Sequence, residues 1–248
     1  MKVKLFLLGK GISKSVSPEI HNNLLQKAGI DAKYGLMDVD LDEIPSVITK
    51  AKAEDVWGFN VTSPYKAEIL KYLDWTDERV KILNASNTVV HRNGKLYGYN
   101  TDVDGVLSAV DGLFVPGSVL ILGRSGAAKA AILAFKDRPV TVYCRDDSKD
   151  SELRKIKEDI QIVYDLKEVE EGMATNLVQA TTVGYNEDKS LLEKPLPGQE
   201  TLFDMIYSPW QTSIMNKLEV HGIVVKNGYD MVLGQAEKCF SLFTEDRV

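Results

Sequence analysis

Residues 118–135 read SVLILGRSGAAKAAILAF, and this stretch decides the fold because it joins an apolar run, a glycine-containing turn and an alanine-rich helical segment. Residues 139–147, PVTVYCRDD, add a second apolar run that ends in acidic side chains. Strand, turn, helix and strand in this order predict the βαβ unit that opens a doubly wound, Rossmann-type dinucleotide-binding domain. Later apolar runs predict four more strands, at residues 162–164, 176–179, 201–205 and 223–226.

The turn GRSGAA, residues 123–128, is the candidate phosphate-binding segment. In the dinucleotide fingerprint the first glycine makes the tight turn, the second lets the backbone approach the pyrophosphate, and a small third residue packs helix on strand. Gly123 and Ala128 fit this pattern, whereas Ser125 takes the second position. Gly126 beside it keeps the N–H groups of the helix start open to a phosphate. An ordinary glycine turn is the alternative interpretation.

The end of the second strand, Cys144–Arg145–Asp146–Asp147, is where the adenosine ribose of a dinucleotide would lie. An acidic residue there favours a free 2′-hydroxyl, and an arginine favours a 2′-phosphate. Both residue types are present, so Asp146 and Asp147 favour NAD while Arg145 favours NADP. A plain charged loop is the alternative.

The first hundred residues alternate apolar runs with helical patterns, which predicts a mostly parallel α/β domain. The expected strands cover residues 3–9, 32–37 and 56–61, and the expected helices cover residues 17–25 and 41–51. Ser17 is the expected N-cap with Pro18 at the first helical position, and a further helix is expected from Pro64. Asn93–Gly94 predicts a type I′ hairpin turn.

These patterns predict an α/β protein of two domains, for which 248 residues suffice. We expect residues 1–103 and 229–248 to form a substrate domain, with the final helix over 229–243 packed back on it. Residues 104–228 are expected to form the dinucleotide-binding domain.

Composition and charge exclude several classes of protein. A net charge of -6 argues against a nucleic-acid surface, which needs clustered basic residues. No window approaches 18 apolar residues, so no membrane span is expected, and the amino-terminal apolar run is too short for a signal sequence. Cys144 and Cys239 form no metal-ligand pattern with the three histidines. We therefore expect reduced thiols, no metal and a cytoplasmic protein.

Polar residues at several strand ends are candidates for a binding site, although each alone is more typical of a cap or a surface residue. In NVTSPYK, Thr62 and Lys66 follow a strand, and a lysine of lowered pKa can act as a general base. In GYNTD, Asp102 is a helix N-cap in the simplest interpretation, but a carboxylate near Lys66 would orient its ammonium. Neutral donors and acceptors suited to hydroxyls and a carboxylate come from Ser15, Ser17, Asn87, Tyr207 and Gln235.

The strings SVSPEIHN, NVTSPYK, ASNTV, GYNTDVDG, DMIYSPWQT and NGYDMVLGQA, taken in this order, closely resemble those of shikimate dehydrogenases over almost the whole chain. The resemblance implies an N-terminal substrate domain, a Rossmann domain and reversible NADPH-dependent reduction of 3-dehydroshikimate to shikimate in aromatic amino-acid biosynthesis. It also implies a small-molecule substrate and a monomer or homodimer.

The resemblance implies a role for each matching residue. Ser15 and Ser17 would hold the shikimate carboxylate, with Tyr207 near it. The residues that would hold the ring hydroxyls are Thr62, Lys66, Asn87, Asp102 and Gln235, of which Lys66 and Asp102 match the catalytic pair. The residues on the cofactor side would be Gly123, Arg124, Ser125, Gly126, Ala127, Arg145, Asp146, Thr181, Met205 and Gly228. His21 also matches a family position, and we interpret it as structural.

Three departures from the family pattern all lie on the cofactor side. The usual GAGGA is GRSGA at residues 123–127, NRT is CRD at 144–146, and NATS is QATT at 179–182. Two alternatives therefore stay open: a quinate/shikimate dehydrogenase that works oxidatively with NAD, and a non-catalytic relative that keeps the substrate pocket. Arg124 could replace a lost contact by reaching for a phosphate, and Arg145 could stack on adenine or pair with a 2′-phosphate.

Overall fold

The computed structural model describes residues 3–53 and 56–245 and divides the chain into two compact units. The first unit contains Met1–Thr101 and Gln235–Val248, and the second contains Asp102–Gly234. The boundaries of the functional domains, expected at 103 and 229, stay predictions.

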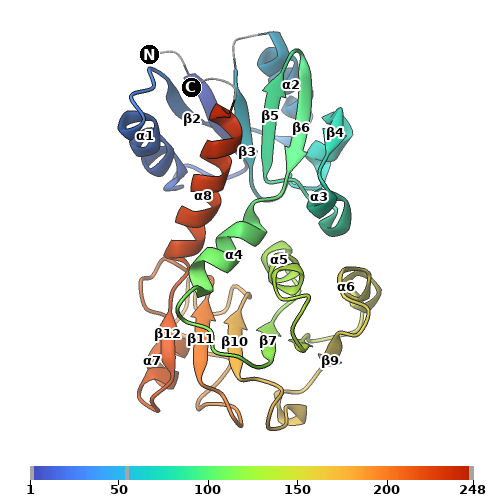
Figure 1. The fold of residues 1–248 in the computed structure, drawn as a ribbon, viewed down its shortest axis with the longest axis vertical. Helices are drawn as coiled ribbons and strands as arrows, with labels where there is room; N and C mark the ends of the chain where they lie inside the picture. Colours follow the sequence, from blue (N-terminus) through green and yellow to red (C-terminus); the bar gives the residue numbers. More distant parts are fainter. Residues whose placement is uncertain (1–2, 54–55, 246–248) are drawn as a thin grey trace. The chain divides into compact units, whose positions relative to one another are not determined.

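The first unit is built on a six-stranded sheet in the order β2-β1-β3-β5-β6-β4 (Figure 1). The strands are β1 (Val3–Gly9), β2 (Lys33–Asp38), β3 (Gly58–Val61), β4 (Trp75–Thr76), β5 (Thr88–Arg92) and β6 (Lys95–Tyr99). The pairs β1–β2, β1–β3 and β4–β6 are parallel, whereas β5 runs antiparallel to both β3 and β6. The expected hairpin turn is confirmed, since Asn93 and Gly94 both have positive φ, 52° and 75°.

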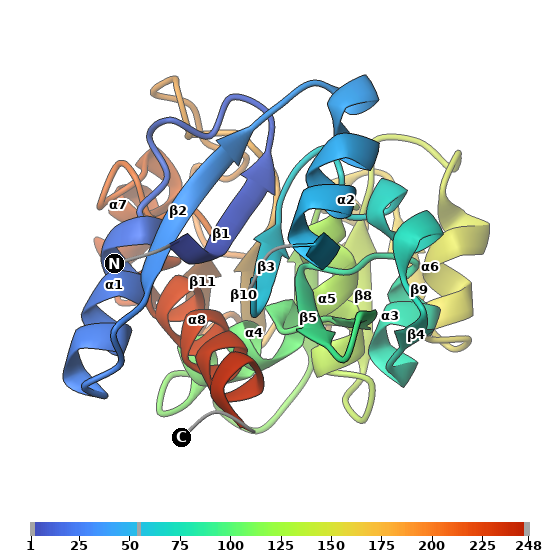
Figure 2. The same cartoon turned by 90° about the horizontal axis from the view of Figure 1, so that it is seen from above.

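Helices flank this sheet, and Figure 2 shows α1 alongside β2. They are α1 (Ser17–Lys27), η1 (Leu41–Glu43), α2 (Ile44–Ala53), η2 (Glu68–Tyr72), α3 (Glu78–Leu83) and the carboxyl-terminal part of α8 (Tyr229–Thr244). Cys239 and Phe243 of α8 are buried in one apolar cluster with Leu5 and Leu7 of β1. The final helix therefore packs on the first sheet, as we expected.

Two expected helix starts are wrong. Val16, not Ser17, is the N-cap of α1, because the Val16 carbonyl accepts the Ile20 N–H at 3.1 Å. The segment after Pro64 is not an α-helix but a series of turns that leads into the 3₁₀ helix η2. The reason is that the Ser86 N–H, at 2.8 Å, takes the Lys66 carbonyl.

The second unit is built on a six-stranded, entirely parallel sheet in the order β12-β11-β10-β7-β8-β9. Its strands are β7 (Val119–Leu122), β8 (Val140–Tyr143), β9 (Gln161–Val163), β10 (Asn176–Gln179), β11 (Thr201–Asp204) and β12 (Val224–Lys226). Counted from β7, this is the 3-2-1-4-5-6 order of a Rossmann sheet. The order reverses between β7 and β10, so a dinucleotide would bind at their carboxyl ends.

Helices and one 3₁₀ turn precede, connect and follow these strands (Figure 1). They are α4 (Asp102–Val110) before β7, α5 (Gly126–Ala134), α6 (Asp150–Ile156), η3 (Leu166–Glu168), α7 (Ser213–Glu219) and the first residues of α8 after β12. The strand residues Leu120, Ile121 and Leu122 are fully buried between two apolar clusters, one on each face of the sheet. A near-continuous apolar strand is what a parallel sheet covered on both faces requires.

Candidate active site

In the first unit, Thr62 follows β3 and Asn87 precedes β5, and the two lie close together because β5 runs antiparallel to β3. The Thr62 N–H donates to the Leu8 carbonyl at 2.9 Å, and the Val61 N–H donates to the Asn87 carbonyl at 2.8 Å. These bonds place both residues at the carboxyl ends of β1 and β3. The half-buried Lys66 is tied to the same place through its own carbonyl, which accepts the N–H of the residue before Asn87. Thr62, Lys66 and Asn87 therefore share one sheet edge.

The loop after β1 brings Ser15 and Ser17 together. Their hydroxyl oxygens lie 3.1 Å apart, and the Ser15 hydroxyl also accepts the Ser17 N–H at 3.2 Å. Because Val16 caps α1, the Ser17 hydroxyl is not used as a helix cap. The Asp38 carboxylate at the end of β2 holds this loop by accepting the N–H groups of Gly11 and Ile12, at 2.9 and 3.0 Å.

A buried polar network holds the side chain of Asn87. Its carboxamide oxygen accepts the Thr101 N–H at 2.9 Å, and its carboxamide nitrogen donates to the Thr101 hydroxyl at 3.1 Å. The buried Cys239 thiol of α8 contacts the Thr101 hydroxyl at 3.1 Å and donates to the Gln235 carboxamide oxygen at 3.7 Å. Asn87 and Gln235 are thus linked through Thr101 and Cys239. Sequence reasoning missed Thr101 and Cys239, since each looks like an ordinary core position.

His21 is fully buried on α1 and stacks on Tyr34, with ring centroids 4.3 Å apart. Neither of its ring nitrogens has a hydrogen-bond partner among residues 3–53 and 56–245. Burial lowers the pKa of His21 from 6.5 to about 4, so the ring is neutral near pH 7. This environment supports a structural role rather than a catalytic one.

Asp102 belongs to the second unit, where it is the first residue of α4. Its side chain is buried, with 8% of its surface exposed. A carboxylate is favourable in the first turn of a helix because the N–H groups there carry partial positive charge.

The glycine turn of the second unit lies at the reversal point of the sheet. Gly123 has φ +105°, and a Cβ there would lie 2.8 Å from the Thr181 methyl carbon and 3.2 Å from the Ala180 carbonyl oxygen. Ser125 is the N-cap of α5: its hydroxyl accepts the Ala128 N–H at 3.1 Å and donates to the Ala180 carbonyl at 2.9 Å. These contacts join the ends of β7 and β10, and Ser125 does the capping that orients the N–H groups of α5.

Gly126 is the residue of this turn that the protein itself does not require to be glycine. A Cβ there would meet no atom within 4 Å, and its φ lies outside the left-handed region. Gly126 and Ala127 begin α5, so their N–H groups are among the first of the helix, which have no partners within it. Open space above N–H groups at a helix start suits a pyrophosphate.

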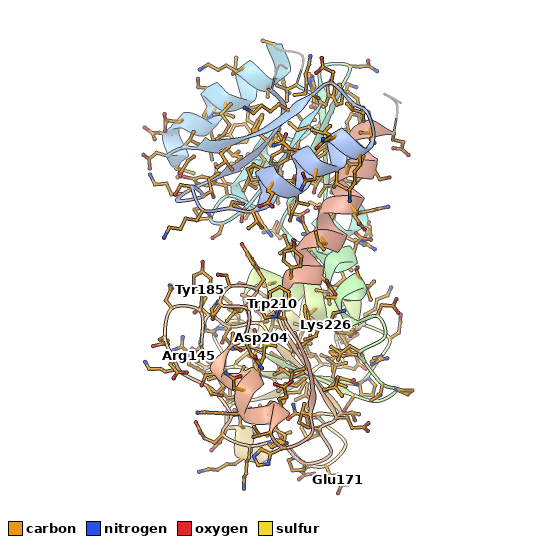
Figure 3. All side chains as sticks on the ribbon, turned by 90° about the vertical axis from the view of Figure 1, so that its left-hand side faces the viewer. Arg145, Glu171, Tyr185, Asp204, Trp210 and Lys226 are labelled. Atoms are coloured by element: carbon orange, nitrogen blue, oxygen red, sulfur yellow. The ribbon has the colours of Figure 1, made fainter. Side chains whose placement is uncertain are left out.

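Arg124 and Asp146 form a two-pronged ion pair between the turn after β7 and the loop after β8. The guanidinium nitrogens donate to the two carboxylate oxygens at 2.5 and 2.8 Å, and one of them also donates to the Ser148 hydroxyl at 2.8 Å. The guanidinium and Ser148 together hold the pKa of Asp146 well below its usual range. Arg145 takes no part: it is exposed at the outer edge of the unit (Figure 3) and has no hydrogen bond or ion pair within residues 3–53 and 56–245.

The remaining cofactor-side residues follow β10, β11 and β12. The Thr181 hydroxyl donates to the Gln179 carboxamide at 3.0 Å, which orients the loop after β10. Gly228 lies against Met205 so closely that a Cβ would be 2.1 Å from the Met205 carbonyl oxygen. Met205 and Gly228 are thereby brought together at the carboxyl edge of the sheet.

Asp204 is a buried carboxylate that sequence reasoning missed, although it precedes Met205 at a strand end (Figure 3). It accepts the Thr212 hydroxyl at 2.6 Å and the Ile206 N–H at 3.0 Å, so it shapes the loop that carries the half-buried Tyr207. Burial raises the pKa of Asp204 to about 6, against the opposing effect of its two hydrogen bonds. Burial also raises the pKa of Tyr207.

Two classes of site are not found in the described part of the chain. Residues 3–53 and 56–245 contain no group of three or more histidine, cysteine, aspartate or glutamate side chains placed to hold a metal ion. No helix among these residues is both long and apolar enough to cross a membrane.

Comparisons with known proteins identify relatives of the whole chain. Residues 7–89 match the model of the shikimate dehydrogenase substrate binding domain. The shikimate dehydrogenase (NADP(+)) of Nitrosopumilus maritimus is 32% identical over 96% of this chain and 91% of its own length.

Two solved structures share the fold over nearly the full length. Shikimate 5-dehydrogenase from Thermus thermophilus, in complex with NADP(H) and shikimate, is 29% identical with a TM-score of 0.89 and covers 98% of this chain and 94% of its own. The enzyme from Listeria monocytogenes, in complex with shikimate and NAD, is 28% identical with a TM-score of 0.89 and covers 98% of this chain and 92% of its own. These matches confirm the resemblance found in the sequence, and the chain belongs to the shikimate dehydrogenase family.

Proposed function

We propose that this protein is a shikimate dehydrogenase, which reversibly reduces 3-dehydroshikimate to shikimate with NADPH as a step of aromatic amino-acid biosynthesis. The observation that carries the proposal is the match to a relative named for this activity, which is 32% identical over 96% of this chain. The substrate-side polar residues of the first unit support it, because Thr62, Lys66 and Asn87 gather at one sheet edge.

Each end of the substrate has suitable polar partners, most of them in the first unit, whereas Tyr207 and Asp102 belong to the second. The paired hydroxyls of Ser15 and Ser17 can both donate to a carboxylate, and we assign them that role together with Tyr207. We assign the ring hydroxyls to Thr62, Lys66, Asn87, Asp102 and Gln235. The network through Thr101 and Cys239 would hold Asn87 and Gln235 in place, so that little side-chain freedom is lost when substrate binds.

The second unit fits a nicotinamide dinucleotide. Open space over Gly126 and the capped start of α5 suit the pyrophosphate, and we assign Met205 and Gly228, which pack closely together, to the nicotinamide ring. When bound, the dinucleotide supplies or accepts the hydride, which no side chain of the protein can do. The residues of the protein bind and orient the substrate and the dinucleotide, and they exchange a proton with the substrate.

We assign the proton exchange to Lys66 and Asp102. In the direction of oxidation one of the two takes the proton of the reacting hydroxyl, and in the direction of reduction it returns that proton to the carbonyl oxygen. Positioned acid–base groups of this kind contribute about 10² to 10⁴-fold in rate. The remaining acceleration would come from holding substrate and cofactor in a reactive geometry.

An absorbance assay at the NAD(P)H band tests the proposal. Shikimate with NADP⁺ is expected to produce a rise in absorbance, and 3-dehydroshikimate with NADPH a fall. Quinate and NAD⁺ as paired alternatives test the oxidative relative, for which Asp146 at the second strand end is the supporting observation. Shikimate binding without turnover of either cofactor would support the non-catalytic relative instead.

We further propose a cytoplasmic enzyme that is a monomer or a homodimer. Both cysteines are buried and neither forms a disulfide within residues 3–53 and 56–245, which suits a compartment that keeps thiols reduced. Fractionation of cells and sedimentation of the purified protein test the two statements.

A further inference from the structure

The ion pair of Arg124 and Asp146 joins the two loops that meet the adenosine half of a dinucleotide. Arg124 lies in the glycine turn after β7, directly before the N-cap of α5. Asp146 lies in the loop after β8, the strand end that meets the adenosine ribose in this fold. A dinucleotide that binds in the manner of the fold therefore meets this pair.

The contacts of the pair engage both side chains at once. One guanidinium nitrogen donates to the Asp146 carboxylate, to the Asp146 backbone carbonyl at 3.1 Å and to the Ser148 hydroxyl. The Ser148 N–H donates back to the carboxylate at 3.1 Å. The loop is thus folded onto Arg124, and the negative charge of Asp146 is fixed at the ribose position.

The two candidate ribose ligands would meet different surroundings here. A 2′-hydroxyl can donate to a remaining lone pair of the Asp146 carboxylate without breaking the pair. A 2′-phosphate is repelled by that carboxylate, and it gains the Arg124 guanidinium only if Asp146 gives it up. Arg145 remains available to either dinucleotide, because it is exposed and has no partner in the described chain.

We propose that the Arg124–Asp146 pair sets the preference of this protein between NADP and NAD, with Asp146 holding Arg124 away from a 2′-phosphate. The inference rests on the proposed function, since it assumes that a nicotinamide dinucleotide binds this unit. Arg124 is the latent phosphate ligand and Asp146 is the residue that restrains it. The two side chains are 24% and 49% exposed, so the pair is open to solvent and can separate when a stronger anion competes.

Titration calorimetry with NADP⁺ and NAD⁺ on the full-length protein tests the proposal. The substitution Asp146→Asn keeps the size of the side chain and removes its charge. It is expected to lower the Kd for NADP⁺ by at least about tenfold while changing the Kd for NAD⁺ by less than about threefold. Arg124→Gln, added to Asp146→Asn, is expected to abolish this gain in NADP⁺ affinity, because the gain depends on a released Arg124, and to leave NAD⁺ binding within about threefold.

Glu152→Gln is the matched control. Glu152 pairs with Lys129 at 2.5 Å between α5 and α6, so its loss removes the same charge from the same unit without touching the strand ends. The ratio of the two Kd values is expected to stay within about twofold in this variant. Thermal unfolding checks that each variant is folded.

Three outcomes decide the proposal. A Kd ratio that moves in Asp146→Asn and returns toward the wild-type ratio when Arg124→Gln is added, but does not move in Glu152→Gln, supports it. A ratio unchanged in Asp146→Asn, or moved equally by Glu152→Gln, overturns it while leaving the proposed function intact. Binding of neither dinucleotide to the wild-type protein overturns both.

Discussion

Single residues of the glycine turn separate what the fold needs from what a ligand needs. Gly123 is glycine for the sake of the protein, because its φ is +105° and a Cβ would lie 2.8 Å from Thr181. Gly126 has open space where a Cβ would be. Glycine is therefore needed at position 123 by the fold, whereas at position 126 it leaves room for a ligand.

This difference predicts opposite effects of two alanine substitutions. Gly126→Ala is expected to leave the melting temperature within about 2 °C and to raise the KM for NADP at least about tenfold, because the added methyl group meets the pyrophosphate and not the protein. Gly123→Ala is expected to lower the free energy of unfolding by more than about 1 kcal/mol. Thermal unfolding and steady-state kinetics measure both. Normal cofactor KM in a folded Gly126→Ala protein would argue against a phosphate at this turn.

Because His21 is buried and neutral, we expect the protein to lose stability at acid pH. Its pKa is about 4 in the folded protein against 6.5 when exposed, so between these values the unfolded chain binds a proton that the folded chain does not. Stability is therefore lost as the pH falls from about 6.5 to about 4, by about 2–3 kcal/mol. In His21→Phe, which keeps a ring against Tyr34, this loss should be absent. Urea unfolding at pH 4.5 and 7.5 measures it, and equal pH dependence in the two proteins would contradict the account.

Asp204 is expected to affect the pH dependence of stability in the opposite direction from His21. Its pKa is raised from 3.8 to about 6, so the folded protein holds a proton that the unfolded chain has released. Its contribution is full below pH 3.8 and is lost as the pH rises through about 6. The stability of Asp204→Asn relative to wild type should therefore increase between pH 4 and pH 7, by about 2–3 kcal/mol. A difference that does not change with pH would show that Asp204 is not protonated in this range.

At the scale of elements, the Rossmann strands and α5 were predictable because a parallel sheet covered on both faces needs apolar strands such as VLIL at 119–122. The segment after Pro64 was not, because the Ser86 N–H that captures the Lys66 carbonyl comes from 20 positions further along the chain. The Arg124–Asp146 pair was missed for the same reason. Sequence reasoning named both residues as cofactor contacts, but their pairing depends on how two strand ends align.

The start of α5 carries a further prediction. Ser125 both caps this helix and donates to the Ala180 carbonyl across the reversal point of the sheet. Ser125→Ala removes both bonds and should lower the free energy of unfolding by about 1–2 kcal/mol. Ser125→Gly, which removes the same hydroxyl at an N-cap that tolerates glycine, should lose less. Denaturant unfolding compares them, and an unchanged Ser125→Ala protein would show that the cap is dispensable.

At the scale of the whole molecule, each unit brings a different half of the chemistry. The first places neutral hydroxyl and amide groups beside Lys66 at one sheet edge, and the second has the strand order and open helix start of a dinucleotide site. The substrate side matches the family pattern in sequence, whereas the cofactor side departs from it at Arg124, Ser125 and Asp146. Ser125 caps α5 and leaves the helix start open to a phosphate, so we expect the departures to bear on which dinucleotide is preferred.

We assign the proton exchange during shikimate oxidation to Lys66 and Asp102 acting together. The rate of NADPH formation from shikimate and NADP⁺, measured for the wild-type protein, for Lys66→Ala and for Lys71→Ala, tests the part of Lys66. Lys71 is the matched control, an exposed lysine on the neighbouring η2 that pairs with Glu68 at 2.7 Å. Lys66→Ala is expected to lower kcat at least about 10²-fold in a protein that still binds shikimate, and Lys71→Ala is expected to stay near wild type. A kcat of Lys66→Ala within about threefold of wild type would contradict it.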